Sequence, residues 1–247
     1  MPLAILPAIT WRKPLSCERV KVNWEHPLNR ELKAYWLLNE GQGNAIELVS
    51  GTQSLVSGAT RVNTNMGQAL SLDGNSDYVN ASQRSVTLAK SGTLFMMARF
   101  RAGTAYAGLI MSRSAATDGF IFNNNGASLE LGLVWDAAWY AYSMSPKMYA
   151  VVNEWRLYVL TVTQTVAMIF AVSTAGTYTS GSLTQLTLGF PAVLDNIYLG
   201  VDSYDVVNRC INTDINYAGI YNRVLSIPEM CSLASYPYGT PNNPRLI

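Results

Sequence analysis

Two aspartates, Asp73 and Asp77, flank a glycine-containing turn and are close enough together to do chemistry. Carboxylate and carbonyl oxygens gathered in this way can hold Ca²⁺. Asp and Asn side chains in such a turn can instead accept hydrogen bonds from their own backbone amides, and then they need no metal. The turn interpretation is favoured because such turns are common. No metal and no cofactor are therefore expected, and Asp73 and Asp77 remain weak calcium candidates.

A second group with chemical potential is an aromatic cluster near the middle of the chain: Trp135, Trp139, Tyr140 and Tyr142. Aromatic faces beside polar groups such as Asp136 could stack on a sugar ring. Trp and Tyr also anchor protein interfaces, where both are enriched, and they can simply cap a core. Core or interface is favoured over glycan binding, and the cluster is kept as a candidate for either surface role.

Catalytic groups are sparse. The chain has one histidine, His26, so a Ser-His-Asp triad would need that residue as its base. Glycosidase chemistry needs two placed carboxyl groups, whereas Glu130 and Glu154 each stand alone on a predicted strand or at its start. The protein is therefore predicted not to be an enzyme, and a hydrolase would have to depend on Glu130 or Glu154.

The composition narrows the class of protein further. Hydrophobic residues make up 49% of the 247 residues, charged residues only 13%, and the net charge is +1. Disorder is excluded, and neither a nucleic acid nor another polyanion is expected as a partner. A surface with so few charges is typical of proteins that assemble, because little repulsion keeps copies apart, so a homo-oligomer is expected. The odd number of cysteines (Cys17, Cys210 and Cys231) argues against a disulfide framework and favours reduced thiols, although a Cys210–Cys231 pair stays open.

No signal peptide or membrane span is predicted. The apolar start of the chain has no preceding basic residue and contains two prolines. Residues 157–175 are uncharged and long enough to span a bilayer. Polar residues at their centre and many β-branched side chains favour two strands joined at Gln164-Thr165 instead.

The N-terminal segment differs from the rest of the chain. Residues 1–33 carry six basic and three acidic residues and four of the ten prolines. Because proline fixes φ and removes a donor, the segment is predicted to be an extended arm. It is too apolar for a solvated linker, so it should lie on its own body or dock on a neighbouring subunit. The docking residues would be Leu3, Ile5, Leu6, Ile9, Trp11, Arg12 and Lys13.

The body reads as strands and turns. Short apolar or alternating stretches recur between Gly, Asn and Ser and predict at least ten strands in an all-β, two-sheet antiparallel jelly-roll sandwich. The predicted strands lie within 32–39, 69–82 (two strands around Asp73-Gly74), 92–102, 107–114, 119–124, 128–135, 156–163, 167–174, 196–203 and 215–223, with a turn at Asn123–Gly126. Ser226, Pro228 and Glu229 predict a capped short helix over 228–234. The expected organisation is an arm over 1–33, a sandwich over 34–235 and an extended tail over 236–247.

Four blocks of this body resemble the laminin-G-like (concanavalin A-like) jelly-roll module, in order and over roughly residues 31–235. They are AYWLLNEGQGNAIELVSG (34–51), MGQALSLDGNSDYV (66–79), EWRLYVLTVTQTVAMIFAVSTAG (154–176) and INYAGIYNRVLSIPEM (215–230). The resemblance makes Trp36, Trp155 and Tyr221 framework residues. It also makes Arg99 unusual, because the family usually has Trp there. A charge at this place should face solvent, pair with a carboxylate or meet a partner.

The run VNWEHPLNRELKAYWLLNEG resembles the entry of laminin-G-like proteins in tailed-phage virions. That resemblance implies a non-enzymatic virion protein, made in the host cytoplasm without a secretion signal. Its expected role is to decorate or cement the capsid, with the major capsid protein or another virion protein as partner. The alternative is a lectin-like glycan- or receptor-binding module of the tail. Deleting residues 1–30 is expected to leave a folded sandwich that no longer binds particles.

Overall fold

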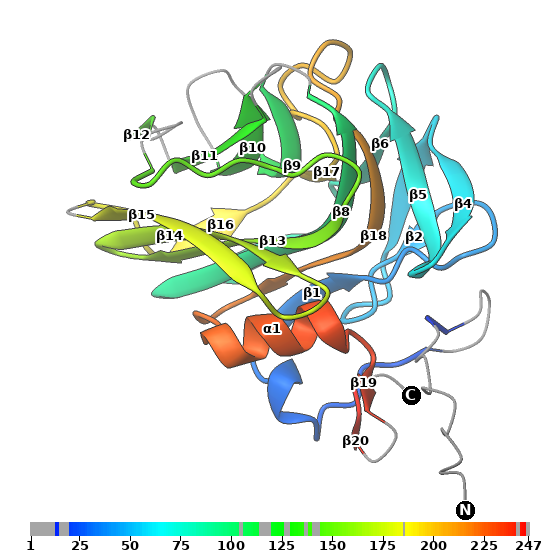
Figure 1. The fold of residues 1–247 in the computed structure, drawn as a ribbon, viewed down its shortest axis with the longest axis horizontal. Coiled ribbons are helices and arrows are strands. Elements are labelled where there is room, and N and C mark those ends of the chain that lie inside the picture. The colour runs from blue at the N-terminus through cyan, green and yellow to red at the C-terminus, as the bar shows by residue number, and fades with distance from the viewer. Residues whose placement is uncertain are drawn as a thin grey trace, which may run out of the picture.

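The computed structural model describes residues 13–14, 20–103, 106–113, 120–125, 129–135, 138–139, 144–184, 186–240 and 243–245. Across this part of the chain the fold is an all-β sandwich of two antiparallel sheets with one helix on the outer face of the first sheet (Figure 1). The predicted fold class is confirmed.

The first sheet forms one layer of the sandwich and carries most of the long strands. Its order is β15-β14-β13-β8-β18-β5-β4, and β1 also pairs with β18. The strands are β1 (Leu32–Trp36), β4 (Thr60–Thr64), β5 (Gly67–Asp73), β8 (Ser91–Ala102), β13 (Trp155–Thr163), β14 (Val166–Ser173), β15 (Tyr178–Thr184) and β18 (Asn212–Tyr221).

The second sheet has the order β12-β11-β10-β9-β17-β6-β3-β2. Its strands are β2 (Ala45–Ile46), β3 (Gln53–Ser57), β6 (Tyr78–Ala81), β9 (Ala107–Ser112), β10 (Phe120–Asn125), β11 (Glu130–Trp135), β12 (Ala138–Trp139) and β17 (Ile197–Leu199). Two further pairs complete the described strands: β7 (Val86–Leu88) with β16 (Ala192–Leu194), and β19 (Gly239–Thr240) with β20 (Asn243–Pro244).

The central strands of the first sheet are buried on both faces, which explains why the sequence of β8 is so uniformly apolar. Successive side chains of a strand point to opposite faces. Met96 and Phe100 enter the main core between the sheets, whereas Phe95 and Met97 enter a second core on the outer face. That second core is covered by helix α1 (Ile227–Ser235) and by the segments near both chain ends.

The hairpin predicted across residues 157–175 is confirmed. Strands β13 and β14 pair in register from Arg156↔Ser173 to Val162↔Ala167, and Gln164-Thr165 makes the turn. Among the described residues no helix is long and apolar enough to cross a membrane.

The helix starts where the sequence places it. Ser226 is its N-cap, Pro228 stands in the first turn, and the Glu229 carboxylate accepts a 2.8 Å hydrogen bond from the Ser226 amide. Arg223 donates to the same carboxylate at 2.7 and 2.9 Å. Although burial acts in the opposite direction, these bonds hold the pKa of Glu229 below its usual value.

The two ends of the described chain are joined by Arg245, which is fully buried. Its guanidinium donates to Asn29 Oδ1 at 2.8 Å, to the Tyr221 hydroxyl at 2.8 Å and to the Pro237 carbonyl at 3.1 Å. Its carbonyl oxygen accepts from the Asn23 amide at 3.0 Å and from Asn29 Nδ2 at 2.9 Å. We call this set of contacts the Arg245 clamp.

Three sequence expectations need correction here. Asn123–Asn125, expected in a turn, continue β10 and pair with Gly132–Glu130 of β11. The tail, expected to be simply extended, folds back as the β19–β20 pair because the buried Arg245 draws it onto the body. The root of the arm contains a 3-10 turn, η1 (Pro27–Asn29).

Candidate functional site

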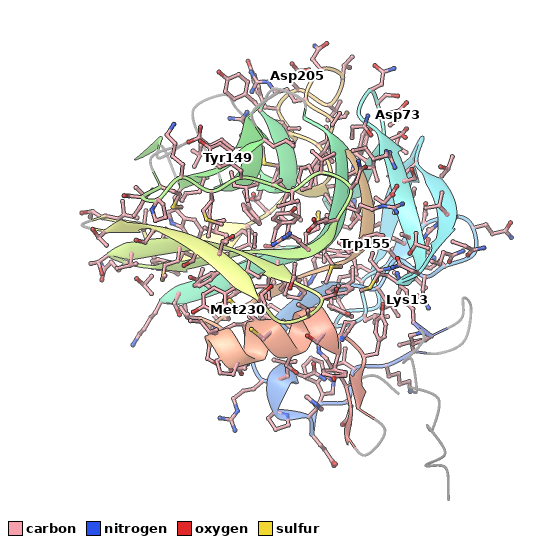
Figure 2. The ribbon with its side chains drawn as sticks, viewed as in Figure 1. Lys13, Asp73, Tyr149, Trp155, Asp205 and Met230 are labelled. Carbon is pink, nitrogen blue, oxygen red and sulfur yellow. The ribbon has the colours of Figure 1, made fainter. Side chains whose placement is uncertain are left out.

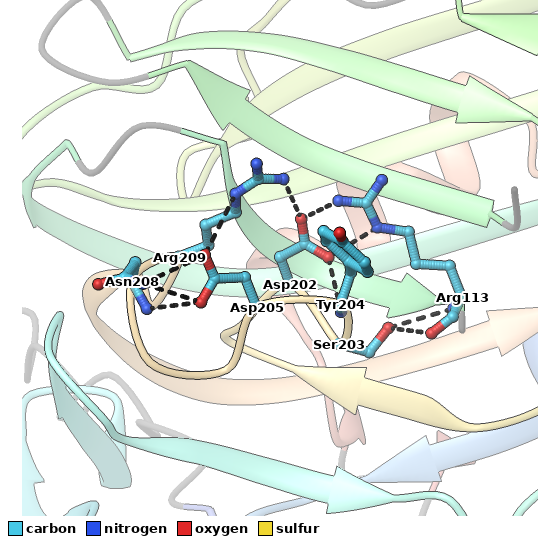
Figure 3. Close-up of polar contacts among 7 residues, drawn as sticks. All are labelled: Arg113, Asp202, Ser203, Tyr204, Asp205, Asn208 and Arg209. Atoms are coloured by element: carbon cyan, nitrogen blue, oxygen red, sulfur yellow. Dashed lines mark hydrogen bonds and ion pairs between the residues drawn. The ribbon is translucent and has the colours of Figure 1, made fainter. Parts of the chain in front are cut away.

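The candidate site is the loop between β17 and β18, at the end of the sandwich opposite α1, together with Tyr106 before β9. Its base is Asp202, which is fully buried between two arginines (Figure 3). Arg113 Nε donates to Asp202 at 2.7 Å, a second Arg113 nitrogen also bonds the carboxylate, and Arg209 Nη1 donates at 2.9 Å. The Tyr204 amide donates to Asp202 as well, at 3.0 Å, which fixes the loop backbone to the same carboxylate.

Two tyrosines and an arginine form the exposed surface above this base. The Arg209 guanidinium carbon lies 5.2 Å from the ring centroid of Tyr106 and 5.9 Å from that of Tyr204. Tyr106 is 40% exposed and Tyr204 49% exposed. Cations within about 6 Å of an aromatic ring are attracted to its face. We call Tyr106, Tyr204 and Arg209 the tyrosine–arginine patch.

Polar groups that can donate and accept hydrogen bonds border the patch. Asp205 accepts from the Asn208 amide and side chain, both at 3.1 Å, and lies 3.9 Å from Arg209 Nε. The Asn208 backbone hydrogen bond is the main reason why the pKa of Asp205 is lowered. Planar aromatic faces, a guanidinium, an amide and a carboxylate on a rigid base are the groups that orient a polar ligand.

The Asp73–Asp77 turn lies at the same end of the molecule as Asp205 (Figure 2). Asp73 Oδ1 accepts from the Asn75 amide at 2.8 Å, and Asp77 Oδ2 accepts from the Asp73 amide at 3.0 Å. Both carboxylates therefore bond backbone amides of their own turn. Among the described residues no group of three or more His, Cys, Asp or Glu side chains could hold a metal ion.

The predicted aromatic cluster does not form one described surface. Trp135 is only 1% exposed, donates from Nε1 to the Gly189 carbonyl at 3.1 Å and packs against Phe190 in the main core. Its ring is thus unavailable to a sugar. Trp139 lies on β12, paired with Val134, and its side chain, like Tyr140 and Tyr142 altogether, lies outside the described residues.

Of the proposed docking residues on the arm, only Lys13 lies within the described residues. It is 4% exposed, and its ammonium donates to the carbonyls of Leu38, Gln68 and Asn216 at 3.2, 2.6 and 2.5 Å. Burial lowers the pKa of Lys13 well below its usual value. Lys13 therefore binds the chain's own body. Leu3, Ile5, Leu6, Ile9, Trp11 and Arg12 fall outside the described residues.

The remaining candidates are held apart from one another. Glu130 is paired with Lys147 at 3.1 Å and Glu154 with Arg156 at 2.8 Å. His26 accepts from the Leu28 amide at the start of η1, and burial lowers its pKa. Arg99 pairs with the Asp214 carboxylate, which is one of the three environments expected for a charge at this place.

Sequence reasoning missed the tyrosine–arginine patch. Its members come from the start of β9 and from the loop before β18, and only folding brings these segments together. One signal was present: the stretch DSYDVVNR (202–209) has three charged residues in eight, within a chain that is 13% charged.

Cys210 lies in the same loop, and the reactivity of its thiol tests whether the loop stays packed against the body in solution. Its thiol is buried and donates to the Val206 carbonyl at 3.1 Å. Burial, and then the nearby aspartates, raise its pKa to about 12, so the thiolate that reacts is scarce. Cys231 is a half-buried free thiol on α1. Iodoacetamide at about pH 8 should modify Cys231 and spare Cys210, as read by peptide mass spectrometry. Equal modification of the two would mean that the loop opens readily.

Comparison with known proteins supports the fold and little beyond it. Neither a protein-family model nor a curated protein matches the chain. Among solved structures, Trypanosoma rangeli sialidase in complex with the inhibitor DANA aligns with a TM-score of 0.57 and 12% identity, over 82% of this chain and 32% of the sialidase. This chain thus spans about a third of the length of that enzyme.

Two smaller proteins align equally well. Domain 4 of AbnA, an extracellular arabinanase of Geobacillus stearothermophilus, in complex with arabinotriose, aligns over 83% of this chain and 98% of the domain (TM-score 0.57, 14% identity). The receptor binding domain of botulinum neurotoxin mosaic serotype C/D aligns over 84% of this chain and 51% of that chain, with the same TM-score and identity. These neighbours are β-sandwich domains and are consistent with the concanavalin A-like jelly roll. They include a carbohydrate-binding domain, so the fold is compatible with a lectin-like module.

Proposed function

We propose that this protein is a non-enzymatic, lectin-like recognition module that contacts glycans through the tyrosine–arginine patch. The observation that carries the proposal is the exposed Tyr106–Arg209–Tyr204 arrangement on the buried Asp202 base. A rigid base lowers the entropic cost of ordering a binding surface. Exposed rings offer sugar C–H groups an apolar face, while Arg209, Asp205 and Asn208 offer hydrogen bonds to hydroxyls.

The state of the acidic groups supports a binding role over a catalytic one. A general acid or base must be free to exchange a proton with substrate. Within the described residues, buried Asp202 and Asp214 each face two arginines. Buried Glu47 is engaged by Arg84 and by the amides of Tyr35, Val49 and Ser50. These carboxylates neutralise positive charge or bond backbone amides.

A glycan array with the full chain tests the patch. The wild type should bind a defined set of glycans, and Tyr204→Ala or Tyr106→Ala should lose at least about tenfold in affinity, because a ring that stacks on a ligand contributes on the order of 1.4 kcal/mol or more. EDTA should not change binding, since Asp73 and Asp77 already bond backbone amides.

Tyr178→Ala is the matched control, because Tyr178 is 45% exposed but lies on β15, outside the patch. It should bind glycans like the wild type. The proposal fails if no glycan binds, or if Tyr204→Ala also binds like the wild type.

The proposed setting of the module is the surface of a tailed-phage particle, as a decoration protein on the shell. Its support is the leader resemblance together with the geometry of the leader's root. Trp24 is 57% exposed there, next to a segment held by the Arg245 clamp. A firmly held root with an exposed tryptophan suits attachment to a larger assembly. The proposed partner is the major capsid protein.

Truncation of the arm tests this setting, and the structure changes where the cut should fall. Removal of residues 1–30 would take buried Val22, Leu28 and Asn29 out of the second core and the clamp. Removal of residues 1–12 leaves every described contact in place, so the variant should keep the wild-type melting temperature and lose particle binding. Quantitative mass spectrometry of purified particles measures the copies bound.

Hundreds of wild-type copies per particle would support decoration. About a dozen would indicate the tail. Complete absence from particles, or unchanged incorporation of the truncated chain, would contradict attachment through the arm. Tyr204→Ala should be incorporated normally, which separates attachment from glycan binding.

A further inference from the structure

A recess lies on the outer face of the first sheet, where α1 does not cover it. It has a volume of about 470 Å³ and is lined by Arg99, Trp155, Met66 and the polar residues Asn65, Asn153, Glu154, Ser173 and Thr174. Small-molecule sites fall in the range of about 300–1,000 Å³. Trp155 is labelled in Figure 2, on the sheet between the β5 hairpin and α1. We call this recess the Arg99 hollow.

The base of the Arg99 hollow carries an excess positive charge. Asp214 is 2% exposed and is bonded by both Arg99 and Arg101. On the rim, Glu154 is paired with Arg156. Three arginines and two acids leave one net positive charge beside the recess. A ligand that brings a negative charge would therefore be favoured, and a cation would not.

Arg99 is arranged to receive that charge. Its Nε and Nη2 donate to Asp214 Oδ2 at 3.0 and 2.6 Å, and no described contact uses Nη1. The guanidinium also lies over the Trp155 ring, 5.3 Å from its centroid, which holds its plane in place. A fixed guanidinium with a spare donor is well suited to a carboxylate oxygen.

The walls favour a ligand that also carries hydroxyl groups. Two amides and two hydroxyls line the recess, and each of these groups both donates and accepts. Trp155 adds an independent observation: it is 8% exposed, and its buried Nε1 has no hydrogen-bond partner among the described residues. A buried donor left unpaired costs free energy, so a ligand or an ordered water that accepted from it would be stabilised.

We infer that the Arg99 hollow binds a small hydroxylated monocarboxylate, the chemistry of a sugar acid. The acid would place its carboxylate on Arg99 Nη1 and its hydroxyls against Asn65, Asn153 and Ser173. The site is separate from the tyrosine–arginine patch, so it would add an acidic residue to what this protein recognises, either as a free sugar acid or within a longer saccharide.

The test uses the ¹⁵N-labelled full chain and three probes: galacturonate, galactose and acetate. Galacturonate should shift the Trp155 indole N–H signal saturably. Galactose, which lacks the carboxylate, and acetate, which lacks the hydroxyls, should bind at least about tenfold more weakly. A tetragalacturonate titration then separates free acid from saccharide as the source.

Two variants and two controls keep the test decisive. Arg99→Gln should weaken galacturonate binding roughly ten- to a hundredfold, the effect of losing a charge-assisted bond. Asn65→Trp should block the recess without touching the Arg99–Asp214 pair, which covers the case in which Arg99→Gln fails to fold. Lys33→Gln removes the same charge elsewhere and should bind galacturonate normally. Tyr204→Ala should also bind galacturonate normally, because its loss of glycan binding concerns only the patch.

The inference is overturned by any of three results. The first is that galacturonate gives no saturable shift. The second is that acetate binds as well as galacturonate, which would make the carboxylate an adventitious ion only. The third is that Arg99→Gln and Asn65→Trp both bind like the wild type.

Discussion

Asp202→Asn should destabilise the protein by about 3–5 kcal/mol, the usual cost of removing one partner of a buried ion pair. The Arg113 side chain is 1% exposed and Asp202 is fully buried, so the substitution removes the negative charge of a buried carboxylate that the buried Arg113 guanidinium bonds. Arg209 would lose its bond to the same carboxylate, and Tyr204 its backbone anchor. Urea unfolding followed by tryptophan fluorescence measures the change in free energy of unfolding.

Asp205→Asn is the matched control, because Asp205 belongs to the same loop but its side chain is 30% exposed. Its effect should stay within about 0.5 kcal/mol, as is usual for surface substitutions. If Asp202→Asn were as mild as Asp205→Asn, the buried pair would not be what fixes this loop, and the rigid base under the tyrosine–arginine patch would have to be abandoned.

Arg245→Ala should be of similar size, about 3–5 kcal/mol, for a different reason. Arg245 has no carboxylate among its described contacts; its guanidinium bonds Asn29, Tyr221 and Pro237 and lies 4.6 Å from the Tyr35 ring centroid. Its removal opens a cavity in the second core and leaves buried acceptors without donors. Hydrogen–deuterium exchange should rise over residues 20–31 and 236–240, while β13 and β14 stay protected.

Arg223→Ala provides the comparison, since Arg223 is a partly exposed arginine that bonds Glu229 near the start of α1 and the Arg30 carbonyl, outside the clamp. It should cost about 1 kcal/mol and leave exchange over residues 20–29 unchanged. A uniform rise in exchange across β13 and β14 with Arg245→Ala would mean that the clamp and the sandwich unfold as one unit.

The strands that the sequence predicts are those whose side chains are mostly buried. Strands β8, β13 and β18 can be predicted from the sequence because apolar residues fill both of their faces. Strands β3, β4 and β15 were not predicted. They are rich in Ser, Thr, Asn and Gly and are largely exposed or half-buried, so their pairing with a neighbour, which a single sequence does not display, decides their conformation.

The candidate site was less predictable for a related reason. Arg113 and Asp202 are 89 residues apart in the chain, and Arg99 and Asp214 are 115 apart. Each pair meets because non-consecutive strands lie side by side in a sheet. The resemblance to the laminin-G-like module singled out Arg99 as an unexpected charge that should face solvent, pair with a carboxylate or meet a partner, but it could not show that Asp214 is its partner. Trp135 proved to be a core residue, one of the alternatives that the sequence left open, because an aromatic residue at a strand end can point to either side.

The Arg245 clamp also determines how the molecule would respond to pulling. The backbone of Asn23 is bonded directly to that of Arg245, and both segments lie on the α1 side of the sandwich (Figure 1). A mechanical load applied between these two segments would pass through the clamp without crossing either sheet. The bonds of the clamp would break first, a few at a time. The chain between the two points of load would then lengthen, while the strands that support the tyrosine–arginine patch remained folded.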